Sequence, residues 1–137
     1  MFGEKIRIIT IGRNQRMIKE KINRLIDACK DDSDMLDIIQ ADVLALGEYT
    51  QAVYSMEFSS AIIREKYEGE KVRDALEKND QDRHNAHERA IMGVKRLNRF
   101  AEMKGLELIF DGDVSNRYEV ADFCCETVKE YFNNRTL

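Results

Sequence analysis

Apolar side chains recur every three or four residues over most of the chain, which is the spacing of one face of an α-helix. The pattern predicts helices over residues 13–30, 35–67 and 70–104. A last helix is expected to begin near Asn116, because Asn116 and Glu119 have the spacing of a capping box. The chain is therefore expected to be mainly helical.

The second of these segments has the longest apolar stripe and the least regular one. Its register is lost near residues 58–62, which predicts a kink or break there. Ser33 is expected to cap this helix at its amino end. Gly69 suits a helix end or tight turn. The stripe itself comprises Met35, Ile38, Ile39, Val43, Leu46, Tyr49, Val53, Met56, Ile63 and Tyr67.

Two helices of this length, joined at Glu68 and Gly69, predict a long antiparallel hairpin with a shorter helix at each end. Such a hairpin exposes more apolar surface than a chain of 137 residues easily covers. A homodimer is the expected way to bury it. We expect a single helical domain over residues 1–137, with a basic segment at 1–30 and a helical body at 33–137.

Two short segments, 5–11 and 106–110, read as extended instead of helical. If both were strands they could pair, and the fold class would shift toward α+β; the all-helical bundle is the preferred interpretation. The absence of proline favours it, because proline would interrupt helix interiors.

Composition narrows the setting of the protein. Its 43% hydrophobic and 35% charged residues are typical of amphipathic helices. The 3 cysteines form neither an even set for disulfides nor a zinc spacing. No apolar run reaches the length of a membrane helix, and no signal peptide precedes the domain. A cytoplasmic protein with no membrane attachment is expected.

Charge is unevenly distributed. Residues 1–30 hold eight basic and three acidic side chains, so this segment carries +5 and the remainder −9 of a net −4. Nucleic-acid binding through phosphate contacts is one interpretation. A solvated helix face, or docking onto an acidic partner surface, is the preferred one. The candidates are Arg13, Arg16, Lys19, Lys21 and Arg24.

The two histidines suggest a metal site. Asp80, His84 and His87 follow one another at helical spacing, so their side chains could converge on one cation. The alternative is preferred, in which His87 packs at a helix interface and His84 faces solvent.

A set of residue blocks in the second half of the chain forms a recognisable pattern: Arg83, Ala86-His87, Ala90-Ile91, Leu97-Asn98-Arg99, Gly105, Ile109, Gly112-Asp113, Arg117, Glu119 to Phe123, Phe132 and Arg135. In this pattern the chain resembles, from about residue 35 to residue 135, a small bacterial family of unknown function, associated with phage, plasmid and conjugative-element genomes. The chain departs from the family at Glu107-Leu108, where the family has a proline, and its basic first helix lies outside the resemblance.

The resemblance implies a fold and a genomic context, and it carries no catalytic residue. Its polar positions Arg83, Asn98, Arg99 and Arg117 could bind a phosphate, since arginine offers a planar fork of donors. The preferred interpretation is structural, with Asn98 satisfying a buried backbone group. His87 is a further candidate of the same kind.

No nucleophile elbow, P-loop, dinucleotide fingerprint or EF-hand occurs in the sequence. No catalytic residue and no cofactor is predicted. The expected function is that of a helical accessory protein acting by protein–protein interaction. The alternatives are nucleic-acid binding through residues 1–30 and metal binding through the histidine pair.

Overall fold

The computed structural model describes residues 16–132, apart from the side chain of Glu57. Within that range the secondary structure is entirely helical, which confirms the predicted mainly α fold. The extended segment 5–11 lies outside the described residues, and 106–110 is irregular instead of a strand. The elements are α2 (Ile18–Ala28), α3 (Ser33–Lys66), α4 (Glu70–Met103), α5 (Arg117–Thr127) and the π-helical turn η1 (Val128–Phe132).

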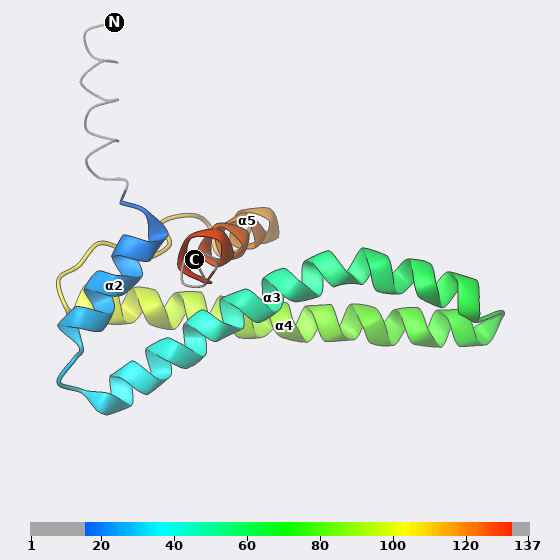
Figure 1. Ribbon diagram of the computed structural model, residues 1–137, viewed down its shortest axis with the longest axis horizontal. Helices are drawn as coiled ribbons and strands as arrows, with labels where there is room; N and C mark the ends of the chain where they lie inside the picture. Colours follow the sequence, from blue (N-terminus) through cyan, green and yellow to red (C-terminus); the bar gives the residue numbers. More distant parts are fainter. Residues whose placement is uncertain (1–15, 133–137) are drawn as a thin grey trace, which may run out of the picture.

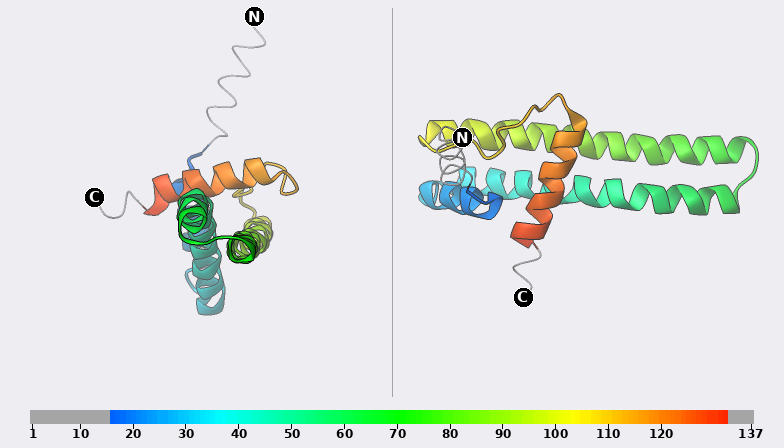
Figure 2. Two further views of the ribbon diagram at one scale, coloured as in Figure 1. Left: turned by 90° about the vertical axis from the view of Figure 1, so that its right-hand side faces the viewer. Right: turned by 90° about the horizontal axis from the view of Figure 1, so that it is seen from above.

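A long antiparallel hairpin of α3 and α4 dominates the molecule (Figure 1). The two helices have 34 residues each, as the apolar spacing predicts. The turn between them includes Gly69 at φ 63°, a left-handed conformation that glycine adopts without strain. The helix α2 lies at the open end of the hairpin, and α5 crosses both long helices on one side (Figure 2).

The core lies where α2 and α5 cover the hairpin. Apolar residues from all four helices meet there, as the helical spacing predicts for amphipathic elements. None of the described helices is both long and apolar enough to cross a membrane. The largest fully buried side chains include Ile22, Leu25, Ile39, Leu46, Leu97, Ile109, Val94 and Val120.

An ion pair with a buried carboxylate ties α3 to α4 inside this region. Asp42 accepts from Arg96 Nε at 2.8 Å and from Nη2 at 2.6 Å, a bidentate arrangement. The helices approach closely here and need glycine at position 93. A β-carbon added to Gly93 would lie 3.2 Å from the backbone oxygen of Asp42. The Asp42–Arg96 pair thus lies at the contact between α3 and α4, where hydrophobic patterning alone predicts only apolar side chains.

Beyond α5 the hairpin projects without cover (Figures 1 and 2). We call residues 51–85 the arm; none of its described side chains is buried. Its seam is partly polar, since Asn79 Nδ2 donates to the Met56 carbonyl at 3.3 Å and to Ser60 Oγ at 3.2 Å. Because helix stability in proteins comes chiefly from packing an apolar face, the arm is the weakest part of the fold.

One prediction about α3 was wrong, and another was wrong in part. The cap is Asp32 instead of Ser33, with Asp32 Oδ1 accepting from the Met35 amide at 3.1 Å. The helix continues unbroken through residues 58–62, so the predicted break is absent, whereas the kink stays a prediction. The register is lost there because Phe58 and Ile62 belong to a second apolar face of the same helix, rotated away from the core face.

Candidate functional site

Exposed apolar side chains recur along a second face of α3. We call this face the outer stripe. Its members are separated by three or four residues, so they share one face of the helix. That face is rotated away from the core face, which Ile39, Val43 and Leu46 occupy. The outer stripe comprises the apolar residues Leu44, Tyr54, Phe58 and Ile62, with Gly47 and the polar Gln51 between Leu44 and Tyr54.

These side chains are uncovered to an unusual degree for their type. Phe58 is 71% exposed, Tyr54 66% and Leu44 48%. Large apolar groups scattered singly over a surface need no explanation, but Tyr54, Phe58 and Ile62 follow one another on a single helix face, which marks an interaction surface. The outer stripe is thus the first candidate for function.

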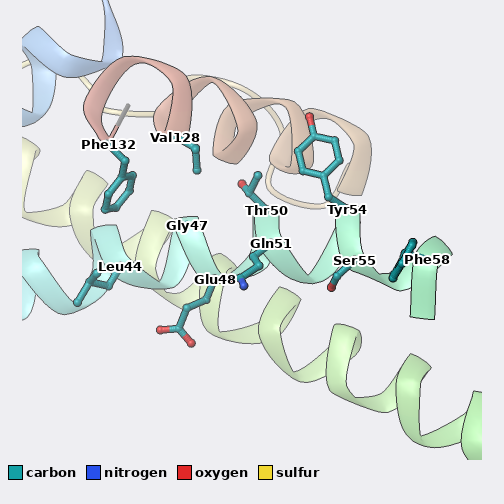
Figure 3. A pocket seen from close by; sticks show the side chains of 10 residues that line it. All are labelled: Leu44, Gly47, Glu48, Thr50, Gln51, Tyr54, Ser55, Phe58, Val128 and Phe132. Carbon is teal, nitrogen blue, oxygen red and sulfur yellow. The ribbon is translucent and has the colours of Figure 1, made fainter. Parts of the chain in front are cut away.

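A groove of about 670 Å³ runs beside the outer stripe, between α3 and the end of the chain's last helix (Figure 3). Phe132 of η1 lies next to Gly47, where an added side chain would meet its ring at 3.3 Å. Phe58 stands at the opposite end of the groove. The lining residues are Leu44, Gly47, Glu48, Thr50, Gln51, Tyr54, Ser55, Phe58, Val128 and Phe132.

The second wall of the groove belongs to η1, and α5, which leads directly into it, contacts α3 through a polar pair. The Tyr54 hydroxyl and Cys125 Sγ lie 2.8 Å apart. The neighbouring Cys124 is fully buried, and burial raises the pKa of its thiol to about 12. A thiol in that state is a packing group and a poor nucleophile.

Two basic residues, Arg16 just before α2 and Arg24 within it, form ion pairs inside the chain. Glu107 accepts from Arg16 Nε at 2.8 Å and from Arg24 Nη1 at 3.4 Å. Lys19 and Lys21 are half-buried. Arg13, the remaining nucleic-acid candidate, lies outside the described residues.

The metal hypothesis is contradicted within the part of the chain that the structure describes. No group of three His, Cys, Asp or Glu side chains there could hold a metal ion, so Asp80, His84 and His87 do not form a centre. Asp80 Oδ1 instead accepts from Arg83 Nη2 at 3.0 Å.

His87 occupies an interhelical position. Its ring centroid lies 5.1 Å from that of Tyr49. Burial lowers the pKa of His87, and the nearby Arg83 and Arg117 charges act in the same direction. The imidazole is therefore neutral at pH 7, and its buried Nε2 has no hydrogen-bond partner among the described residues.

The polar residues of the family resemblance separate into different environments. Asn98 binds the backbone of Phe110, donating to its carbonyl at 2.7 Å and accepting from its amide at 3.0 Å. Arg99 is exposed on α4, away from the others. Arg83 and Arg117 both line a pocket of about 450 Å³ where α5 begins.

Two features of this surface were missed in the sequence. Tyr49 was assigned only to the core stripe, although it also lines the pocket that holds Arg83 and Arg117. The outer stripe was interpreted as a loss of register. Its signal is in the sequence: Leu44, Tyr54, Phe58 and Ile62 share a helical face that is distinct from the core face.

Comparison with known families gives one match. The model of a family described as a protein of unknown function, DUF3232, matches residues 8–137. The match includes the basic first helix, which the resemblance over residues 35–135 had left outside. No curated protein and no solved structure matches the chain.

Proposed function

Because the chain belongs to the DUF3232 family, whose function is unknown, we propose its function from the geometry: a helical protein–protein interaction module that forms a homodimer through the outer stripe of α3. The observation that carries the proposal is the set of uncovered apolar side chains Leu44, Tyr54, Phe58 and Ile62 on one face of α3, beside a groove. The association of the protein with mobile genetic elements and its cytoplasmic location stay predictions.

A second copy suits this surface because the outer stripe is complementary to itself. Leu44 and Ile62 are the two ends of the stripe. In an antiparallel pair of α3 helices centred on the stripe, Leu44 of one copy would therefore lie against Ile62 of the other. Phe58 then faces the partner's Gly47–Glu48 region and the Phe132 ring that packs against Gly47, an apolar contact. Such self-matching is what a two-fold dimer interface requires.

The arm gives a second reason for a homodimer. Two antiparallel helices alone bury little, and no described side chain between residues 51 and 85 is buried. Two arms side by side would form a four-helix arrangement, the common way in which helical hairpins acquire a core. Burial of each Phe58 would contribute about 1.5–3 kcal/mol.

We do not extend the proposal to nucleic acid. Arg16 and Arg24 share the carboxylate of Glu107, so contact with a phosphate would compete with an existing ion pair. Cations paired in this way support the docking of α2 onto the rest of the chain. They leave fewer unpaired positive charges for contacts with phosphates.

The test is the mass of the protein in solution, measured by sedimentation equilibrium. The native chain should have twice its 16.0 kDa monomer mass. Phe58→Asp should weaken the dimer at least about 100-fold, because two aromatic rings are lost and two charges are introduced. Phe58 is 71% exposed, so the variant should keep the helical circular dichroism of the native chain.

Met103→Asp is the matched control. Met103 is 65% exposed at the far end of α4 and belongs to neither the outer stripe nor the groove. This variant should remain dimeric. A monomeric native chain, or a dimer that survives in Phe58→Asp, would contradict the proposal.

A further inference from the structure

The pocket that holds Arg83 and Arg117 is separate from the outer stripe. It lies where α3, α4 and the start of α5 meet, and each helix supplies part of its wall. The side chains that matter here are Tyr49, Val53, Met56, Arg83, Arg117 and Ala121, with Tyr118 at the rim.

The charge in this pocket is unbalanced. Two guanidinium groups line it, whereas no Asp or Glu does. Asp80, which is 62% exposed, accepts one hydrogen bond from Arg83 Nη2. Arg83 Nε is buried and has no hydrogen-bond partner in the described part of the chain. The exposed part of the Arg83 guanidinium can donate to an anion in the pocket, because the side chain is 22% exposed and its carboxylate partner, Asp80, lies on its surface side.

Arg117 has still fewer partners. Its guanidinium lies 5.5 Å from the centre of the Tyr118 ring, a cation–π contact. No described carboxylate lies within ion-pair distance of it. Because Arg117 is the first residue of α5, the positive end of the helix dipole adds to its charge.

Tyr49 supplies a further polar group. Burial raises the pKa of its hydroxyl, which therefore stays protonated at neutral pH, and the nearby Arg83 charge acts in the opposite direction. The charges of Arg83 and Arg117 both reach Tyr49 and His87, so the two guanidiniums act on one small region. Val53, Met56 and Ala121 make the rest of the wall apolar.

We propose that this pocket binds a small phosphate monoester, with Arg83 and Arg117 holding the phosphate and the wall of Val53, Met56 and Ala121 holding its organic part. Two planar guanidiniums match a phosphate, which carries between one and two negative charges near neutral pH. A carboxylate would balance only one of them. A pocket of about 450 Å³ lies in the range of small-molecule sites.

The experiment is a titration of the full-length protein with phenyl phosphate, followed by amide chemical shifts at constant ionic strength and pH 7.5. Saturable shifts are expected at Val53, Ala121 and their neighbours. Inorganic phosphate should shift the same amides with lower affinity, because it lacks the apolar part. Arg117→Gln should weaken phenyl phosphate binding at least about tenfold, the loss of one charge-assisted contact.

Arg99→Gln is the control, since Arg99 is exposed on the same molecule and does not line the pocket. Its affinity should equal that of the native chain. Phe58→Asp should also bind normally, which separates this proposal from the homodimer. The absence of saturable shifts, equal binding by Arg117→Gln, or no preference for the ester over inorganic phosphate would overturn it.

Discussion

Arg96 and Asp42 show how strongly a single ion pair can depend on its surroundings. The Asp42 side chain is 3% exposed and that of Arg96 is 42% exposed. The arginine can turn to solvent, but the carboxylate cannot. Removing Arg96 therefore leaves a buried charge without its partner, and losses of about 3–5 kcal/mol are typical of that situation.

We expect Arg96→Gln to destabilise the protein by about 3 kcal/mol, measured by urea unfolding. The matched control is Arg89→Gln. Arg89 Nη2 lies 3.9 Å from Glu48 Oε2, and both side chains are more than half exposed. A surface pair of this kind contributes about 0–1 kcal/mol. Equal losses in the two variants would show that the burial of Asp42 has no energetic consequence.

His87 should make stability depend on pH. Its pKa is lowered in the folded chain, chiefly by burial, from the unfolded value of 6.5. The unfolded chain therefore takes up a proton more readily, and stability must fall as pH drops below about 6.5. Above that pH both states are neutral, and the effect vanishes.

The measurement is the melting temperature at pH 7.5 and at pH 5.5. His87→Phe keeps a ring against Tyr49, so the variant should lose less stability between the two pH values than the native chain. His84→Phe is the control, because the His84 side chain is 56% exposed and that of His87 is 20% exposed. A native-sized pH effect in His87→Phe would exclude this histidine as its source.

At the scale of elements, Asn98 fixes the connection between α4 and α5. Its side chain satisfies both the amide and the carbonyl of Phe110, which is itself buried. Such an amide replaces the strand partner that an extended segment would otherwise need. The position of α5, and with it one wall of the groove, depends on this contact.

Asn98→Ala should therefore loosen the segment from Leu106 to Phe110. Two backbone groups would lose their partners, at about 1–3 kcal/mol each. Hydrogen exchange of the Phe110 amide should accelerate more than that of Leu97 in the core. Asn23→Ala on α2 is the control, because Asn23 is exposed. Unchanged exchange at Phe110 would mean that other contacts hold the segment.

The helices could be predicted from the sequence because their apolar spacing is local information. Asn98 could also be singled out, since an amide at a stripe position needs a partner. The identity of that partner could not, because Phe110 is reached only after the chain turns at Gly105. Asp42 was missed for the same reason: its partner Arg96 lies 54 residues away, and a lone acid on a helix looks solvated.

At the scale of the whole molecule, α3 was difficult to interpret because it has two apolar faces. One packs on α4 and the other is the outer stripe. If only one apolar stripe is assumed, the residues of the second face appear as an interruption of the first. For this reason the sequence predicts a kink or break at residues 58–62. The pocket of Arg83 and Arg117 was hidden differently, since it is built from three helices whose crossing no local pattern specifies.

The arm offers the last prediction, which concerns how stability is distributed along the hairpin. If a second copy covers the outer stripe, amides of residues 58–66 should be protected from hydrogen exchange in the native dimer. In Phe58→Asp the same amides should exchange at least about tenfold faster, because an uncovered two-helix arm opens locally. Amides near Leu97 lie in the core and should exchange alike in both proteins. Equal exchange in the arm of both proteins would show that the hairpin is stable by itself and that its apolar outer face is covered by something other than a second copy.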